Sequence, residues 1–115
     1  MLLAIDIGNT NIVIGAIDND EIVFKARIAT ERQRTSDQYG VEIKNMLEAF
    51  GVKISDIDDC IIASVVPPVF NSVHTGVMKV IGKQPMVVGP GFGSLKLAEF
   101  ISCHRRSRSS NCFFK

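Results

Sequence analysis

The apolar residues in the first 28 positions are spaced as in three β-strands. Residues 2–7 form a nearly continuous apolar run, which is typical of a central strand covered on both faces. A second run covers residues 12–17, and its short connections, such as the polar turn at residues 18–20, predict an antiparallel meander. Residues 21–28 alternate between apolar and charged side chains, so we expect one face of this strand to meet water. The apolar positions of this third strand are Ile22, Phe24, Ala26 and Ile28.

Two later segments have the three-and-four spacing of amphipathic helices. The first is expected to begin at Thr35, because Thr35-Ser36-Asp37-Gln38 has the spacing of a capping box, and to end at Gly51. Its apolar stripe consists of Tyr39, Ile43, Met46, Leu47 and Phe50. The second is expected between Pro67-Pro68, which can open a helix, and Gly82. Its apolar stripe consists of Phe70, Val73, Val77, Val80 and Ile81.

Two more apolar runs, at residues 60–66 and 86–88, predict a buried strand before the second helix and a short strand after it. The order is therefore three strands, a helix, a strand, a helix and a strand. A meander followed by crossover connections predicts an α/β fold with a mixed sheet and helices across its faces. This order resembles one lobe of the ribonuclease H-like fold that actin, sugar kinases and heat-shock ATPases share.

The composition is that of a small globular domain or of one lobe of a larger protein. Hydrophobic residues make up 46% of the 115 positions and charged residues 22%, which argues against disorder. The formal net charge of +1 gives no reason to expect a nucleic acid or an anionic membrane as a partner. Because no apolar stretch reaches the ~18 residues of a membrane span and no basic leader precedes the first strand, we expect a cytoplasmic protein. The three cysteines lack metal-ligand spacing and are expected to be reduced thiols.

The segment from Asp6 to Asn11 concentrates polar residues between two apolar runs. Gly8 allows a ligand to approach the main chain closely, and the amides of a tight turn form a concavity that binds anions. The side chains of Asn9, Thr10 and Asn11 add hydrogen-bond donors. Asp6 could hold a magnesium ion, usually through water, because that ion prefers hard oxygen ligands and keeps its hydration. The segment is therefore either a phosphate clamp or a plain hairpin, in which Asp6 would accept main-chain hydrogen bonds.

Three segments resemble a known family when they are taken together: AIDIGNTNIVIG, RTSDQYG and ASVVPP. Their order and separation are similar to those in the N-terminal half of type III pantothenate kinases, also called the Bvg accessory factor family. The resemblance covers residues 1–91. Sugar kinases of the same superfamily usually carry a second glycine where Asn9 stands and a lysine where Asn11 stands, so the Asn-Thr-Asn triplet is the specific part.

The resemblance implies that the first hairpin binds the phosphates of ATP, with Asp6 facing a magnesium ion. It assigns the phosphate contacts to Asp6, Ile7, Gly8, Asn9, Thr10, Asn11, Ile12 and Val13. Family members phosphorylate pantothenate with ATP in the first step of coenzyme A synthesis. They require a monovalent cation, potassium or ammonium, and work as homodimers. The chain is therefore expected to act on a small molecule, with no nucleic-acid or membrane partner.

Three other groups of residues are expected to be structural. A polar cluster should cap and orient the first helix: Thr35, Asp37 and Tyr39. Arg32 and Arg34 are expected to be solvated, and His74 to face solvent on the second helix. Residues 64–68 should shape the turn from strand to helix, although their place at the carboxyl end of a strand also fits the border of a nucleotide cleft.

The composition changes from Phe92 onward. Residues 92–115 contain five Lys or Arg against one acidic residue, together with five serines. We therefore expect residues 1–91 to form the nucleotide-phosphate-binding lobe and residues 92–115 to be a disordered or loosely attached tail. The resemblance implies a later Gly-Ala-Asp-Arg segment, whose Asp is the general base, and a second lobe whose Asp-Phe-Gly-Thr motif provides the cation ligand. Neither motif occurs in this chain, so no catalytic residue is assigned.

These observations leave three interpretations of the chain. It is a pantothenate kinase by descent with impaired or absent activity, a non-catalytic nucleotide-binding or regulatory module, or an incomplete lobe with no function of its own. The last would expose apolar surface and aggregate. Another small-molecule kinase of the same superfamily is the alternative enzyme.

We expect the abrupt change after Gly91 to reflect a shifted reading frame. Translation of the gene past codon 91 in the other two frames should therefore reveal a Gly-Ala-Asp-Arg segment. The measurement is genomic sequencing across that codon. If no frame encodes the segment, the hypothesis is wrong.

Overall fold

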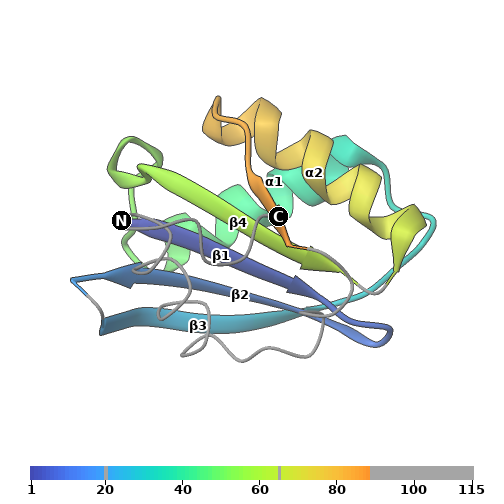
Figure 1. Cartoon of the computed structure of the whole chain (residues 1–115), viewed down its shortest axis with the longest axis horizontal. Coiled ribbons are helices and arrows are strands. Elements are labelled where there is room, and N and C mark those ends of the chain that lie inside the picture. Colours follow the sequence, from blue (N-terminus) through green and yellow to red (C-terminus); the bar gives the residue numbers. More distant parts are fainter. Residues whose placement is uncertain (20, 65, 89–115) are drawn as a thin grey trace.

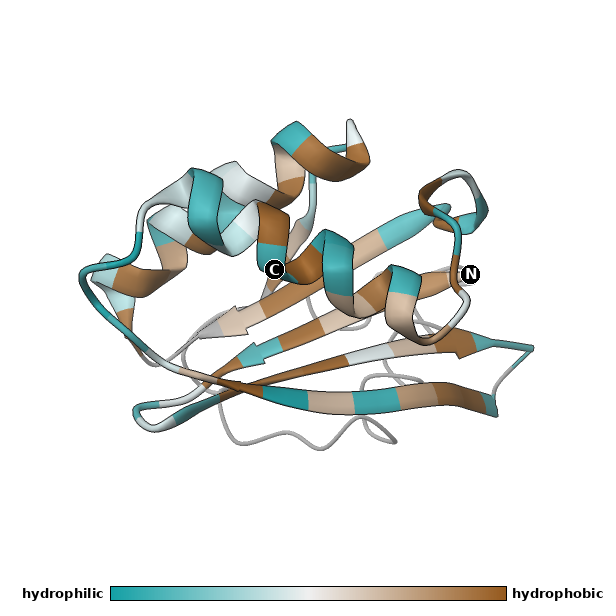
Figure 2. Ribbon diagram, turned by 180° about the vertical axis from the view of Figure 1, so that it is seen from behind, coloured by the Kyte–Doolittle hydropathy of each residue, from teal (hydrophilic) through white to brown (hydrophobic). Residues whose placement is uncertain are grey.

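The part of the chain that the structure describes folds into a five-stranded sheet with two long helices on one of its faces (Figures 1 and 2). The computed structural model describes residues 1–19, 21–64 and 66–88. Its elements are β1 (Leu2–Ile7), β2 (Asn11–Asp18), β3 (Glu21–Ala29), α1 (Ser36–Ala49), the short 3-10 helix η1 (Ile54–Asp56), β4 (Asp59–Ser64), α2 (Pro67–Ile81) and β5 (Met86–Val88). This order confirms the predicted α/β class. The tail predicted for residues 92–115 lies outside the described residues.

β1 lies at the centre of the sheet, whose strand order is β3-β2-β1-β4-β5. It pairs antiparallel with β2 and parallel with β4, and β5 pairs parallel with β4. β3 pairs antiparallel with β2, which confirms the predicted meander. The parallel pairs need crossover connections, and these contain α1 and α2. The carboxyl ends of β1, β4 and β5 therefore lie at one edge of the sheet, together with the turn from β1 to β2 (Figure 1).

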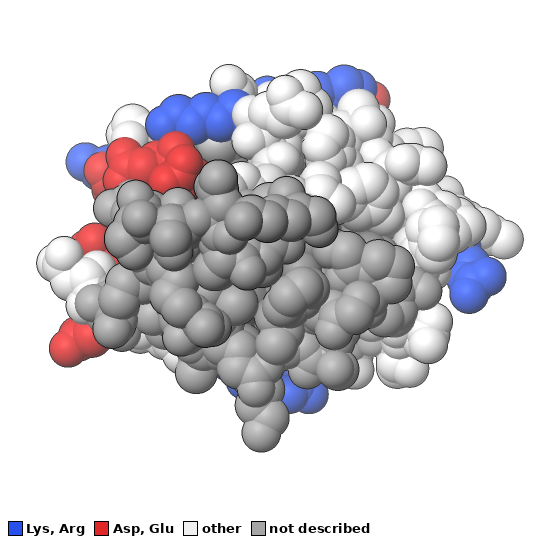
Figure 3. All heavy atoms as spheres, viewed as in Figure 1, with Lys and Arg blue, Asp and Glu red and all other residues white. Residues whose placement is uncertain are grey.

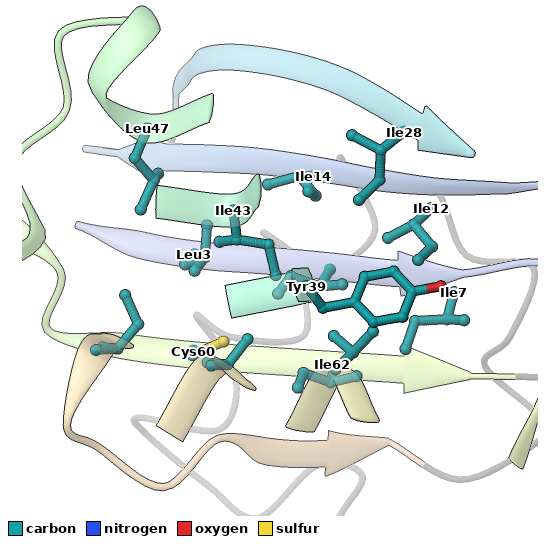
Figure 4. Close-up of a cluster of buried hydrophobic side chains, with 14 of the residues drawn as sticks. Leu3, Ile7, Ile12, Ile14, Ile28, Tyr39, Ile43, Leu47, Cys60 and Ile62 are labelled. Atoms are coloured by element: carbon teal, nitrogen blue, oxygen red, sulfur yellow. The ribbon is translucent and has the colours of Figure 1, made fainter. Parts of the chain in front are cut away.

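The main core lies between the sheet and the two helices (Figure 4). Large side chains from both layers are almost fully buried there, among them Leu3, Ile7, Ile14, Tyr39, Ile43, Leu47, Ile62, Val73 and Val77. Each large apolar side chain that leaves water in this way contributes roughly 1.5–3 kcal/mol.

The opposite face of the sheet carries a second, smaller cluster. It consists of Leu2, Ala4, Ile17, Ile61 and Ala63, all of them buried. Neither described helix contributes to this cluster. β1 is therefore buried on both faces, as its continuous apolar run predicted.

Local capping signals set the ends of both helices. The N–H of Gln38 donates to Thr35 Oγ1 at 3.2 Å, and the N–H of Thr35 donates to Gln38 Oε1 at 2.8 Å, which confirms the predicted capping box. Gly82 ends α2 in the left-handed conformation with a φ of 76°. Pro67 and Pro68 occupy the first turn of α2, where a missing N–H leaves no helical hydrogen bond unmade.

The two helices touch main chain to main chain where Gly40 meets Gly76. A Cβ atom on residue 76 would lie 2.5 Å from the carbonyl oxygen of Ser36 and 2.9 Å from the nitrogen of Gly40. Both distances are shorter than any ordinary carbon contact, so only glycine fits at this crossing. An ion pair between Lys79 and Asp37, with 2.9 Å between Nζ and Oδ1, also joins the helices.

The pairing of β2 with β3 contains one irregularity. The register pairs Phe24 with Ala16 and Ile22 with Ile17, and so passes over Val23. An extra residue of this kind, a β-bulge, moves the side chains beyond it to the other face. Ile22 therefore shares the face of Ile17 and is 44% exposed. The sequence pattern predicted that Ile22 lies on the same face of the strand as Phe24, and the bulge makes that prediction wrong.

The surface of the described part mixes charges of both signs. In the space-filling view, acidic and basic side chains lie next to one another at the upper left (Figure 3). Phe50, expected on the buried stripe of α1, is 49% exposed because it follows the last helical residue. Its ring nevertheless stacks on Phe24 with 4.6 Å between ring centroids. No helix in the described ranges is long and apolar enough to span a membrane.

The crossing at Gly76 predicts a large effect of a single methyl group. Gly76→Ala should destabilise the fold by roughly 1–3 kcal/mol, because the added carbon forces two main chains apart. Thermal unfolding should show a clear fall in Tm. Thr75→Ala, at an exposed position of the same helix, is the matched control and should leave Tm nearly unchanged. Equal Tm values for the Gly76→Ala variant and the wild type would contradict the close contact.

Candidate functional site

The turn between β1 and β2 lies where several elements end or begin (Figure 1). Ile7, the last residue of β1, pairs with Ser64, the last residue of β4, and α2 begins at Pro67. On the other side, Asn11 at the start of β2 pairs with Ala29 at the end of β3. The polar segment singled out in the sequence is therefore bordered by three strand ends and one helix start.

The turn itself is tight. The N–H of Gly8 donates to the carbonyl oxygen of Asn11 at 2.9 Å. A Cβ atom on residue 8 would lie 3.1 Å from that same oxygen, closer than most carbon–oxygen contacts. Glycine at this position thus allows the two ends of the turn to approach each other.

The remaining residues assigned to phosphate contacts differ in exposure. The three polar side chains of the turn are exposed: Asn9, Thr10 and Asn11. Ile7 and Ile12 are fully buried in the main core, so only their main-chain atoms are available to a ligand. Val13 is partly buried and lies directly opposite Asp6 in the register.

Asp6 lies on the sheet face opposite the helices, between Val13 of β2 and Ala63 of β4. Its Oδ1 atom is buried and has no hydrogen-bond partner among the residues that the structure describes. Burial raises the pKa of the Asp6 carboxyl group from its ordinary 3.8 to about 6. A plain hairpin would give this oxygen main-chain donors. A buried carboxylate oxygen without a partner therefore favours a site for an external ligand.

Thr30, directly after β3, holds the turn from its other side. Its Oγ1 hydroxyl donates to the carbonyl oxygen of Gly8 at 2.8 Å, and its N–H donates to the carbonyl oxygen of Thr10 at 2.9 Å. The sequence interpretation missed this residue. Counting outward from the turn, where Asp18 pairs with Glu21, would place Ala29 opposite Thr10. The bulge at Val23 shifts the register by one residue and brings Thr30 there instead, so no signal in the sequence pointed to Thr30.

Two structural predictions near the start of α1 are confirmed, and one is wrong. Thr35 caps the helix and Tyr39 is fully buried. Arg34, expected to be solvated, forms ion pairs with Glu31 and Glu42, and its side chain is only 24% exposed. Glu42 is one to two helical turns along α1, so this pairing depends on how the preceding segment folds back onto the helix.

The expectations for α2 have mixed outcomes. His74 is partly buried rather than freely solvated, with 5.4 Å between its ring centroid and that of Phe70. Pro67 and Pro68 shape the start of the helix as predicted. The side chain of Ser64 and the whole of residue 65 lie outside the described part, so the possible border of a nucleotide cleft stays a prediction there.

An open hollow of about 640 Å³ lies over the outer face of α1. Arg34, Asp37 and Gln38 are among its lining residues. Arg34 and Asp37 form ion pairs, and Gln38 completes the capping box. These three polar groups therefore serve the fold, and the turn beside Asp6 is the stronger candidate site.

Comparison with known proteins identifies one family. The sequence model of the family described as type III pantothenate kinase matches residues 2–98. A protein named type III pantothenate kinase from Bifidobacterium longum (strain DJO10A) is 50% identical over 91 residues, which are 79% of this chain and 36% of that protein. Proteins of the same name from Syntrophobacter fumaroxidans and Geobacillus thermodenitrificans are 45% and 43% identical over 79% of this chain and 35% of their own length. The chain thus spans little more than a third of the curated relatives that it matches.

The raised pKa of Asp6 predicts how stability depends on pH. Between pH 3.8 and about 6 the unfolded chain loses the Asp6 proton while the folded chain retains it, so stability falls as the pH rises through this window. Asp6→Asn abolishes this loss. At pH 7.5 the variant should be more stable than the wild type by about 1 kcal/mol, after allowance for solvent screening of a partly exposed group.

Thermal unfolding at several pH values measures this difference. The Tm of Asp6→Asn should exceed that of the wild type at pH 7.5 and approach it at pH 3.5. A variant that is less stable than the wild type at pH 7.5 would show that the Asp6 carboxylate has stabilising partners, against the geometry described above.

Proposed function

The chain belongs to the type III pantothenate kinase family, and we propose that its turn between β1 and β2 binds the phosphates of ATP for the phosphorylation of pantothenate, the first step of coenzyme A synthesis. One observation carries the proposal: directly before an exposed polar turn, Asp6 has a buried carboxylate oxygen that no group in residues 1–19, 21–64 or 66–88 hydrogen-bonds. The matched relatives are named for this kinase activity, which supports pantothenate over the substrates of other small-molecule kinases.

The oxygen donor at this site fits a magnesium ion. Magnesium is usually held by one or two protein carboxylates together with phosphate oxygens, and it keeps several of its waters. Asp6 offers one such carboxylate. No cluster of three or more His, Cys, Asp or Glu that could hold a metal occurs in residues 1–19, 21–64 and 66–88, so an ion that needs few protein ligands is the one that suits the site. When bound, magnesium would neutralise charge on the phosphate oxygens.

The residues of the chain have separate tasks in this proposal. Asp6 is mostly ionised at neutral pH, because its pKa of about 6 lies below 7, and its carboxylate would hold a hydrated magnesium ion. Asn9, Thr10 and Asn11 donate hydrogen bonds to phosphate oxygens. Gly8 keeps the turn tight, so that these donors converge. The buried side chains that flank the turn hold it in place against the core.

The complete reaction needs groups that this sequence lacks. Phosphoryl transfer depends on placing nucleophile, metal and phosphate together in one closed site. Neither the Gly-Ala-Asp-Arg segment nor the Asp-Phe-Gly-Thr motif implied by the family resemblance is found among the 115 residues. We therefore propose that this chain by itself binds nucleotide weakly and turns over little or nothing. A potassium or ammonium ion, a homodimer and a cytoplasmic location complete the proposal for the intact kinase.

The test compares two carboxylate variants at opposite ends of the sheet. Asp6→Asn should lower the affinity for Mg–ATP about tenfold or more in isothermal titration calorimetry, because the metal-facing charge is lost. Asp18→Asn removes an exposed carboxylate at the far end of β2 and is the matched control, expected to bind as the wild type does. Omission of magnesium should reduce the affinity of the wild type to that of Asp6→Asn. Equal affinities of Asp6→Asn and the wild type would refute the phosphate clamp.

A second candidate function is a nucleotide-binding module without catalysis, because the exposed polar turn beside Asp6 would serve binding alone equally well. Saturable Mg–ATP binding without pantothenate-dependent ADP release would support this module. ADP release by the purified chain, dependent on pantothenate, would instead show that residues beyond the expected motifs complete the catalytic site.

A further inference from the structure

The carbonyl groups of the turn are held by one residue from outside it. Thr30 binds the carbonyl oxygen of Gly8 through its Oγ1 hydroxyl at 2.8 Å and that of Thr10 through its N–H at 2.9 Å. These two carbonyls lie on either side of Asn9. The main-chain conformation around Asn9 is thus set from the residue directly after β3, a strand that does not itself pair with β1.

Because the peptide bond is planar, the direction of the Gly8 carbonyl also fixes the direction of the Asn9 N–H. The carbonyl of Gly8 and the N–H of Asn9 belong to the same peptide unit, and in a trans peptide they point in opposite directions. A hydrogen bond that draws the Gly8 carbonyl toward Thr30 therefore turns the Asn9 N–H away from Thr30. Rotation of this peptide unit would break the bond with the Thr30 hydroxyl.

Thr30 is itself anchored through its neighbour. The N–H of Glu31 donates to the hydroxyl oxygen of Tyr39 at 2.9 Å, and that hydroxyl donates to the carbonyl oxygen of Glu31 at 2.6 Å. Tyr39 is fully buried on α1, and Figure 4 shows its hydroxyl reaching toward Ile7 at the end of β1. The segment that carries Thr30 is thereby attached to the main core.

We propose that Thr30 is a positioning residue: its hydroxyl, through the carbonyl of Gly8, orients the main-chain N–H of Asn9 toward a bound nucleotide phosphate, and Tyr39 holds Thr30 in place. This inference rests on the proposed function of the turn and adds to it a residue outside the resembling motif. It also gives the buried Tyr39 hydroxyl a role beyond packing. Orientation of a donor before the ligand arrives raises affinity, because binding then needs no rearrangement of the main chain.

The decisive variants are Thr30→Val and Thr30→Ser. Valine has the shape of threonine but lacks the hydroxyl, whereas serine retains it. In calorimetric titrations with Mg–ATP, Thr30→Val should lose about tenfold in affinity, the effect of one hydrogen bond. Thr30→Ser should remain within about threefold of the wild type. Thr75→Val, at an exposed position on α2, is the control for a change from threonine to valine elsewhere.

A spectroscopic measurement separates orientation from stability. The ¹⁵N-labelled amide of Asn9 should shift in the ligand-free Thr30→Val variant and keep its wild-type position in Thr30→Ser. Tyr39→Phe should move the same signal in the direction seen for Thr30→Val. A fall in Tm without a change at Asn9 would mean that Thr30 is merely structural.

The outcomes distinguish this inference from the proposed function. If Asp6→Asn binds Mg–ATP at least tenfold more weakly than the wild type, while Thr30→Val binds as the wild type does, the positioning role is overturned and the phosphate clamp stands. If Asp6→Asn and the wild type have equal affinities, the proposed function fails, and this inference fails with it.

Discussion

β1 forms hydrogen bonds with β2 on one side and with β4 on the other, and its side chains are buried on both faces of the sheet. This double burial marks β1 as the central strand of the described sheet, with β2 and β4 as its direct neighbours. Because β2 runs antiparallel to β1 and β4 runs parallel to it, the first turn, the end of β4 and the start of α2 must meet at one edge. The place of the candidate site follows from this pairing.

Asp6 is the exception on the buried strand. Its carboxyl group occupies a position where an apolar side chain would stabilise the sheet, and its pKa is raised to about 6 because the protein removes water without supplying hydrogen bonds. Such a group opposes folding when it is charged and gains most when a cation approaches it. A conflict between stability and local chemistry is expected at functional sites, and the rest of β1 shows no comparable conflict.

Local sequence signals predicted most of the fold. Some features depend only on residues a few positions apart, so the sequence was sufficient to predict them. They are the capping box at Thr35, the prolines that start α2 and the regular spacing of apolar residues. The bulge at Val23 and the hydrogen bonds of Thr30 depend on how two strands are registered. The ion pairs of Arg34 depend on how a connecting segment folds back. Asp6 was recognised as chemically unusual from its neighbours in the sequence, but the lack of a partner for its oxygen is a property of the folded sheet.

The two outer strands of the sheet bear on how copies of this chain could associate. β3 carries the bulge at Val23 together with the charged side chains of Lys25 and Arg27, and β5 comprises three residues, Met86–Val88. An edge strand that is bulged and charged, as β3 is, pairs poorly with a strand from another molecule. An edge strand of only three residues, as β5 is, also pairs poorly. Within the described part, a continuous intermolecular sheet across either border is therefore disfavoured by the shape of the strands themselves, and the homodimer proposed for the intact kinase would use helices or loops instead.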